Sequence, residues 1–189
     1  MTGITLREVV LPDDAPQLAD LDTSFTTDVV YAVARDVDGF RLDPVRVEPP
    51  VTKRFHIDDV PRAWDCGVVA VADGAVRGFV ATGFEPWNAR LVIWHFYVDP
   101  AWRRRGIGRA LIEKALDEGA ACGATTAWLE TSSLNYPGVQ VYERLGFELC
   151  GLDTTLYRGT RSDGETALFL ARDIARIDYV VPDTLPGVG

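Results

Sequence analysis

The sequence predicts a single α/β domain, and three observations lead to that class. The chain has 189 residues, 47% of them hydrophobic and 25% charged, which suits one globular domain with its own core. Three strand-like runs with tight turns between them fill residues 66–98. Directly after them the apolar spacing becomes helical, with Ile107, Leu111 and Ala115 on one face. Strands and helices therefore share one chain, and no interior linker divides it.

The first 65 residues predict a strand, a helix and a β-hairpin, followed by a less regular stretch. In chain order the elements are a strand at Ile4–Val9, a helix at Ala15–Leu21 after the Pro12–Asp14 turn, a strand at Val29–Arg35, the hairpin turn Asp38-Gly39 and a return strand at Phe40–Val47. Pro49-Pro50 is expected to interrupt regular structure, and Thr52–Asp65 to form a loop or short helix.

The rest of the chain predicts a strand meander followed by alternating helices and strands. The expected elements are strands at Cys66–Ala72, Ala75–Phe84 and Arg90–Val98, a helix from about Ile107 to Gly119 or Gly123, a strand at Thr125–Thr131, a helix at Gly138–Leu145, and strands at Phe147–Cys150, Thr154–Tyr157 and Thr166–Leu170. Gly146 is placed to end its helix in the left-handed conformation. We expect the domain to span residues 1–171 and a C-terminal tail to span residues 172–189.

The charge balance argues against a nucleic-acid-binding protein. The chain has 19 Lys and Arg against 28 Asp and Glu, a formal net charge of −9, whereas nucleic acids attract a cationic surface. An acidic chain suits a cationic ligand, although acidity for solubility alone is the commoner reason for such a charge.

The cysteines and the apolar runs give no sign of export, of a metal or of a membrane. Cys66, Cys122 and Cys150 are odd in number and widely spaced, so we predict neither a disulfide framework nor a metal site. No signal peptide is apparent, and the longest apolar runs are too short to cross a bilayer. We therefore expect a cytoplasmic protein in a reducing compartment.

The segment from Val98 to Leu116 predicts an anion-binding loop. A strand leads through Gly106 and Gly108 directly into a helix, so unpaired backbone N–H groups and the helix dipole converge on one point. Glycine lets the backbone approach the anion, and Arg103, Arg104 and Arg109 add positive charge. A plain helix entry with solvated arginines is the alternative. The spacing is neither that of a dinucleotide-binding fingerprint nor that of a Walker loop.

Two motifs in this order resemble the GCN5-related N-acetyltransferase (GNAT) superfamily. They are R-x-x-G-x-G at residues 103–108, and WLETSSLNYPGVQVYERLGF at residues 128–147. The resemblance implies a mixed, mostly antiparallel central sheet flanked by helices, with acetyl-CoA as co-substrate. It implies that acetyl-CoA is bound by Phe96, Val98, Arg103, Arg104, Gly106, Ile107, Gly108, Arg109, Asn135 and Tyr142.

The same resemblance implies roles for individual residues. Asn135 either hydrogen-bonds the pantetheine arm or positions the next helix, and Tyr142 acts as general acid unless it is merely a core tyrosine. The backbone N–H of Phe96 or Val98 would receive the acetyl oxygen.

Glu130 is the first candidate for the general base. It matches a position used as base in the ribosomal-protein branch of the superfamily. His95 and Asp153 acting through water remain alternatives, His95 because its unperturbed pKa near 6.5 suits the task.

Further segments resemble one branch, the streptothricin (nourseothricin) acetyltransferases. SFTTD at residues 24–28 and GLDTTLYRGTRSDGE at residues 151–165 carry this resemblance. It implies acetylation of an amine on the β-lysine moiety of a cationic antibiotic, which confers resistance. The expected substrate contacts are Asp28, Glu85, Trp87, Asp153 and Tyr157, although the carboxylates suit caps and turns equally well.

Three alternatives stay open. The acceptor could instead be a protein N-terminus or lysine, or a polyamine, and the chain could be a non-catalytic module that binds acetyl-CoA. Because dimers are usual among relatives, a homodimer is also an expectation.

Overall fold

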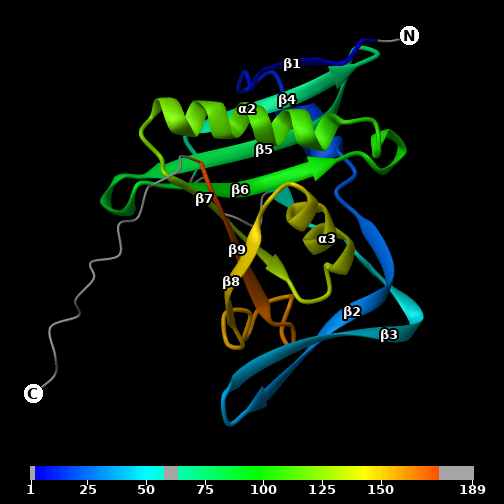
Figure 1. Cartoon of the computed structure of the whole chain (residues 1–189). Coiled ribbons are helices and arrows are strands. Elements are labelled where there is room, and N and C mark those ends of the chain that lie inside the picture. Colours follow the sequence, from blue (N-terminus) through cyan, green and yellow to red (C-terminus); the bar gives the residue numbers. More distant parts are fainter. Residues whose placement is uncertain (1–2, 58–63, 175–189) are drawn as a thin grey trace, which may run out of the picture.

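The described residues, 3–57 and 64–174 of the computed structural model, form one seven-stranded sheet and a separate two-stranded hairpin (Figure 1). The sheet order is β1-β4-β5-β6-β7-β9-β8, and only the β6–β7 pairing among these strands is parallel. This confirms the mixed, mostly antiparallel sheet. The strands are β1 (Thr5–Glu8), β4 (Cys66–Ala72), β5 (Ala75–Glu85), β6 (Arg90–Val98), β7 (Thr126–Ser132), β8 (Glu148–Asp153) and β9 (Ala167–Asp173).

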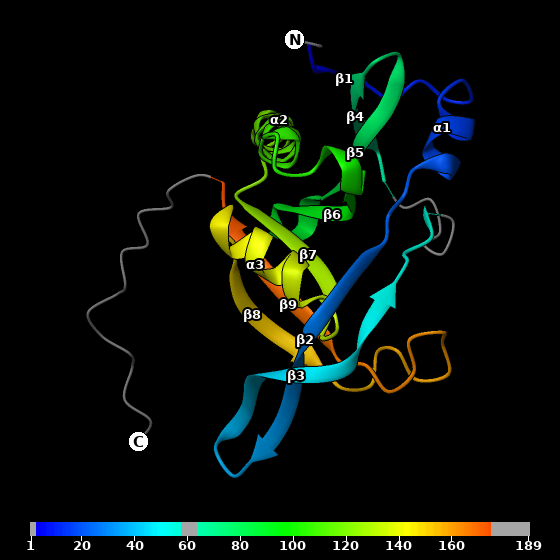
Figure 2. The same ribbon diagram turned by 90° about the vertical axis from the view of Figure 1, so that its right-hand side faces the viewer.

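Helices cover both faces of this sheet. The helices α2 (Ile107–Ala121) and α3 (Tyr136–Arg144) pack on one face, and α1 (Ala15–Asp20) lies on the other (Figure 2). The buried side of α2 has the helical spacing that its sequence predicts, and it joins β4–β7, β9 and α3 in the larger core. Leu18 and Leu21 join Phe79 in the smaller core on the opposite face. Gly146 follows α3 with φ 85°, as predicted for a left-handed cap.

The hairpin of β2 (Phe25–Asp36) and β3 (Gly39–Lys53) projects from the body of the protein (Figures 1 and 2). Its tip is exposed, with Val37 99% accessible. Its base is tied to the sheet, because the N–H of Tyr31 donates to the carbonyl oxygen of Ser133 at 2.9 Å. The ends of both strands therefore return to the body next to β6 and β7.

The return strand continues past its predicted end at Val47 to Lys53, although Pro49-Pro50 does interrupt its pairing with β2. The register with β2 shifts here, from Val51 opposite Thr27 to Arg46 opposite Val29. The prolines lie in the irregular stretch that this shift creates. An edge strand with a bulge tolerates proline, since no neighbour there requires its missing N–H.

The strand predicted at Thr154–Tyr157 is also absent from the described residues, which form turns there. The Asp153 carboxylate accepts the backbone N–H of Thr155 at 2.6 Å and that of Leu156 at 3.1 Å. An aspartate that bonds the backbone ahead of it competes with strand pairing, so the β-branched residues that follow do not extend β8. The last strand ends at Asp173 rather than near Leu170, so it includes the first two residues of the predicted tail. Residues 175–189 lie outside the described part.

The feature that creates a site is the separation of β6 from β7. They pair over Arg90–Ile93 and Thr126–Leu129, and then diverge (Figure 1). At the point of divergence the β5–β6 register shifts, so that Ala81 faces His95 but Thr82 faces Ile93. Trp94 is thus the extra residue of a bulge. A bulge bends its strand, and this bend directs the end of β6 away from β7.

We expect Leu111→Ala to destabilise the fold strongly. Leu111 is fully buried where α2 packs on the sheet, and truncating such a leucine typically costs about 2–5 kcal/mol through lost burial and a residual cavity. Urea unfolding followed by circular dichroism measures this loss. Val37→Ala at the exposed hairpin tip is the control and should change stability by less than about 0.5 kcal/mol. Equal losses in the two variants would contradict this description of the core.

Candidate active site

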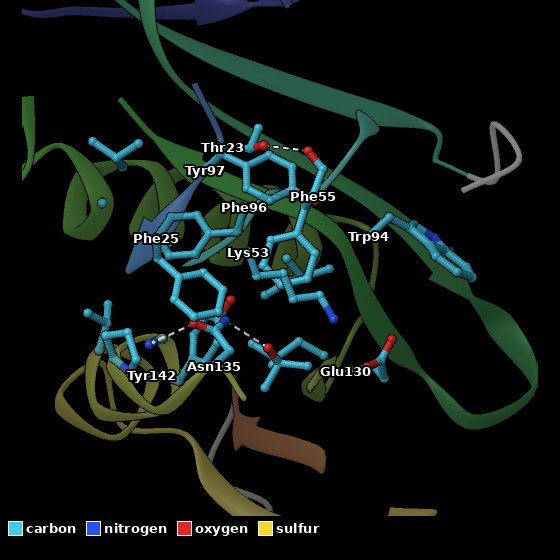
Figure 3. A pocket seen from close by; sticks show the side chains of 18 of the residues that line it. Thr23, Phe25, Lys53, Phe55, Trp94, Phe96, Tyr97, Glu130, Asn135 and Tyr142 are labelled. Carbon is cyan, nitrogen blue, oxygen red and sulfur yellow. Dashed lines mark hydrogen bonds between the residues drawn. The ribbon is translucent and has the colours of Figure 1, made fainter. Parts of the chain in front are cut away.

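A cavity of about 940 Å³ lies where β6 and β7 part (Figure 3). Leu129 and Glu130 are neighbours on β7, and both line it. Because successive strand side chains point to opposite faces, the cavity passes through the gap in the sheet from one face to the other. All ten residues that the resemblance implies for acetyl-CoA line this cavity.

The α2 end of the cavity has the geometry of an anion site. Gly106 precedes α2 with φ 83° and Arg104 has φ 63°, so two residues of the loop that leads into the helix have a left-handed backbone conformation. A Cβ on Gly108 would lie 3.2 Å from Cζ of Phe96, which explains the second glycine by close packing. The backbone N–H groups of the first turn of α2 therefore open onto the cavity beside Arg104 and Arg109.

Arg103 ties the loop in place. Its Nε donates to the carbonyl oxygen of Val98 at 3.0 Å, and its Nη2 donates to that of Ser24 at 2.5 Å. Burial lowers the pKa of this guanidinium from its usual value, partly opposed by Asp22 and Asp99. The side chain thus joins β6, the glycine loop and the segment that leads into β2.

The unpaired edge of β6 presents backbone N–H groups to the gap. Beyond the end of β6 the N–H of Asp99 donates to Arg77 on the β5 side, at 2.9 Å. Because alternate amides of a strand face the same side, those of Phe96 and Val98 face the other edge, away from β5. These are the two amides that the sequence analysis proposes for the acetyl oxygen.

Asn135 caps α3. Its Oδ1 accepts the N–H of Gly138 at 3.1 Å, and its Nδ2 donates to Oγ1 of Thr131 at 2.9 Å. A Cβ on Gly138 would lie 2.3 Å from Nδ2 of Asn135, so glycine is required for the cap to close. Of the two roles left open for Asn135, these contacts favour positioning of the helix.

Tyr142 lines the cavity from α3 while its ring packs in the core. The side chain is 9% exposed, and its ring centroid lies 5.9 Å from that of Phe96. Burial raises the pKa of the Tyr142 phenol far above its usual value, and the negative charge of Glu130 adds to this effect. The hydroxyl group therefore keeps its proton at any physiological pH.

Glu130 faces the cavity and accepts a hydrogen bond from the Tyr157 hydroxyl group. Burial raises the pKa of Glu130 above its usual value, while the hydrogen bond from Tyr157 and the charge of Lys53 oppose this rise. A carboxylate whose pKa is raised is a stronger base than an ordinary one, which suits Glu130 to accept a proton.

The wall around Glu130 contains residues that the sequence analysis missed as site residues. Most are aromatic: Phe25, Phe55, Trp94 and Tyr97, with Thr23 and Lys53 beside them (Figure 3). The rings of Phe25 and Phe55 lie 5.9 Å apart, and those of Phe55 and Tyr97 6.0 Å apart. Lys53 is one of two lysines among the 19 Lys and Arg residues of the chain, and no motif indicated it as a site residue.

Four of the five expected substrate contacts lie outside the cavity, and Tyr157 alone lines it. Asp28 pairs with Arg46 at 2.6 Å on the exposed hairpin, and Asp153 stabilises its own turn. Glu85 is exposed and Trp87 is 82% exposed. Both lie where β5 turns into β6, at the opposite end of β6 from the glycine loop. An ion pair explains Asp28 and local turn chemistry explains Asp153.

His95, the second candidate base, is 1% exposed and does not line the cavity. Its ring stacks on Phe79, with centroids 5.9 Å apart, and packs near Tyr97. Phe79 belongs to the core on the α1 face, so His95 is a packing residue on that side. Of the three candidate bases, Glu130 alone reaches the cavity.

Comparison with known proteins decides the family. Residues 36–147 match the model of the acetyltransferase (GNAT) family. The chain belongs to this family. It is 41% identical over 170 residues to streptothricin acetyltransferase from Streptomyces lavendulae, an alignment that covers 85% of this chain and 90% of that protein. The resemblance read from the two motifs is thereby confirmed, and the chain is an N-acetyltransferase.

Solved structures agree with the GNAT fold. A crystal structure of nourseothricin acetyltransferase superposes with a TM-score of 0.84 at 42% identity, covering 91% of this chain and 99% of that one. A Bacillus anthracis protein solved in complex with acetyl coenzyme A shares the fold, with a TM-score of 0.74 at 22% identity over 90% of this chain and 98% of that one. Among the helices of residues 3–57 and 64–174, none is long and apolar enough to span a membrane.

We expect Asn135→Ala to destabilise this GNAT domain by about 1 kcal/mol, because an N-cap side chain is lost at a buried helix end. Urea denaturation measures the change. Asn135→Asp is the matched control: it keeps an oxygen for the N–H of Gly138 and should recover most of the loss. If both variants lose the same stability, the bond to Thr131 rather than the cap carries the contribution of Asn135.

Proposed function

We propose that this acetyltransferase transfers the acetyl group of acetyl-CoA to an amine of a streptothricin-class antibiotic, at the β-lysine moiety. One observation carries the proposal. The segments that resemble streptothricin acetyltransferases most specifically line the same cavity as Glu130: one contributes Phe25, and the other contributes Arg161 and Tyr157, whose hydroxyl group donates to Glu130. The alignment with the streptothricin enzyme of Streptomyces lavendulae covers 85% of this chain.

The α2 end of the cavity fits acetyl-CoA. A pyrophosphate requires backbone N–H donors, positive charge and room for close approach, and the residues around Gly106 and Gly108 offer all three. Arg104 and Arg109 line this end and are suited to the phosphates, while Arg103 holds the loop. When bound, acetyl-CoA supplies an activated acetyl thioester.

The chemistry then needs three things of the protein: a base, a donor for the carbonyl oxygen and an acid. Glu130 takes the proton that the amine loses as the N–C bond forms. The N–H groups of Phe96 and Val98, which face the gap, are suited to stabilise the negative charge on the carbonyl oxygen. Tyr142 gives its hydroxyl proton to the sulfur as the C–S bond breaks, and its high pKa keeps that proton available.

The acceptor end carries less negative charge than the overall composition suggests. Among the described residues that line the cavity, Glu130 is the one carboxylate, beside several arginines and Lys53. A single ammonium group near Glu130 suits this charge balance better than a whole polycation enclosed by carboxylates. We therefore propose that one amine enters the cavity and that the rest of the antibiotic stays outside.

We also propose that the enzyme works in the cytoplasm. Cys66, Cys122 and Cys150 are all free thiols with exposed side chains, which agrees with a reducing compartment.

A direct assay tests the acceptor. We expect nourseothricin to be acetylated with a kcat/KM at least about 100-fold above that of an alanine-initiated peptide or of spermidine, because a site shaped for one amine discriminates strongly. Release of free CoA, measured with a thiol reagent while each amine is offered in parallel, gives the three values.

The alternatives predict different results in this assay. A protein or polyamine acetyltransferase would consume the peptide or spermidine and leave the antibiotic unchanged. A non-catalytic module would bind acetyl-CoA in calorimetry and release no CoA with any of the three amines.

A second prediction concerns Tyr142. We expect Tyr142→Phe to lower kcat by about 100-fold or more at every pH tested, because it removes the proton donor and keeps the ring in the core. Acetyl-CoA affinity, measured by calorimetry, should stay close to that of the unchanged protein. Tyr136→Phe on the same helix, whose ring packs against Tyr31, is the control and should keep normal turnover. Weaker acetyl-CoA binding at normal turnover would reduce Tyr142 to a packing role.

A further inference from the structure

A lysine is unexpected in a cavity that receives an amine. Lys53, at the end of β3, lines the wall around Glu130, and Figure 3 shows its side chain extending toward the side of the cavity where Glu130 lies. Like charges repel, so a cation there disfavours an incoming ammonium group unless it has a partner or a function.

Lys53 has both a partner and a fixed place. Its ammonium group pairs with Glu165 and donates to Oγ of Ser162 at 2.9 Å. The side chains of Lys53 and Glu165 are only 15% and 13% exposed. The Lys53 nitrogen also lies 5.3 Å from the ring centre of Phe55 and 5.8 Å from that of Tyr157. An ammonium group with this many contacts does not swing freely in solvent.

The pair joins two parts of the chain that are far apart in sequence. Lys53 ends the projecting hairpin, while Ser162, Glu165 and Tyr157 belong to the loop between β8 and β9. Glu165 in turn accepts a hydrogen bond from the Ser132 hydroxyl group at the end of β7. The loop that carries Tyr157 is thereby held against the strand that carries Glu130.

The formal charges near Glu130 also add up simply. Lys53 and Glu165 cancel, so Lys53, Glu165 and Glu130 together carry one negative charge, and Arg161, which lines the same cavity, adds a positive one. The other titratable groups around Glu130 are Tyr157 from the loop and Tyr142 from α3, and His56 and Arg161 line the same cavity.

We propose that Lys53 is a positioning residue of the reaction: paired with Glu165, it holds Tyr157 against Glu130 and keeps the Glu130 carboxylate ionised so that it can accept a proton from the amine. The inference rests on the proposed role of Glu130 as base. It explains why a site for an amine contains a cation of its own. The direction of the Lys53 effect on the pKa of Glu130, which is downward, agrees with this role.

The sign of the pH effect follows from this arrangement. The base works when ionised, so kcat/KM falls as the pH drops through the pKa of Glu130. Loss of the Lys53 charge raises that pKa and moves the acidic limb of the profile to higher pH. The ionisation of the free amine contributes equally for every variant, so differences between variants come from the enzyme.

The experiment compares pH profiles of kcat/KM for the unchanged enzyme, Lys53→Met and Lys53→Arg, with nourseothricin as the amine. We expect Lys53→Met to move the acidic limb upward by about one pH unit, the usual size of a neighbouring opposite charge. At a pH below the acidic limbs of both enzymes, this shift lowers kcat/KM of Lys53→Met about tenfold relative to the unchanged enzyme. Lys53→Arg keeps the charge, so its limb should stay in place even if its maximal rate falls.

Two further variants keep the test decisive. The double variant Lys53→Met with Glu165→Gln leaves no unpaired ion and guards against a folding failure of the single one. Its limb should still move upward, because the Lys53 charge acts on the pKa of Glu130 more strongly than the Glu165 charge does. The shift should be smaller than in Lys53→Met, because the double variant also removes the Glu165 charge, which raises that pKa. Ser162→Ala removes one hydrogen bond of Lys53 without a charge and should leave the limb unmoved.

A uniform loss of rate in Lys53→Met without a shift of the limb would overturn the proposal, since the lysine would then only support the structure. An equal shift in Lys53→Arg would overturn it too, because the charge would not be the cause. Glu130→Gln separates this failure from that of the proposed function. The ionisation of the amine, known from its own titration, is first divided out of each profile. If the remaining limb persists in Glu130→Gln, the base assignment itself is wrong; if it disappears there while Lys53→Met shows no shift, only the inference about Lys53 fails.

Discussion

The parting of two parallel strands is the constraint on which the site depends. β6 and β7 share hydrogen bonds up to Ile93 and Leu129, and the extra residue Trp94 then bends β6 away. A continuous sheet would have paired the amides of Phe96 and Val98 and closed the cavity. The bulge instead leaves a strand edge open inside the protein, next to the start of α2 and to Tyr142 on α3. The glycine loop, the two free amides of β6 and the Tyr142 hydroxyl group are thus brought to one cavity by one break in the sheet.

The gap also separates two chemical environments across the sheet. The α2 end has backbone N–H groups, Arg104 and Arg109, and suits phosphates. Around Glu130 there are aromatic rings and a neutralised ion pair, and this end suits an amine. Glu130 and Leu129 are adjacent in the chain but face opposite sides, so β7 reaches both environments. The net charge of −9 therefore says little about either end, because most carboxylates lie elsewhere on the surface.

Much of the fold and the donor half of the site could be predicted from sequence, because their signals are local. Strand alternation, the spacing of Ile107, Leu111 and Ala115, and the glycines Gly106 and Gly146 are set by backbone geometry over a few residues. Where a prediction was wrong, another local interaction prevailed. Asp153 bonds the backbone ahead of it and turns the chain, and a register shift accommodates Pro49-Pro50 within β3.

The acceptor half was less predictable, because it is assembled from segments 27 to 112 residues apart in the sequence. Lys53 meets Ser162 and Glu165, and Glu130 meets Tyr157, through contacts that no sequence spacing encodes. Asp28, Glu85, Trp87 and Asp153 were reasonable candidates by composition, yet the fold directs them elsewhere. The sequence by itself determined the elements, the glycine loop and the acetyltransferase motifs, since each depends on neighbours along the chain. Only the tertiary structure decided which charges line the cavity, because burial and pairing between distant segments set that choice.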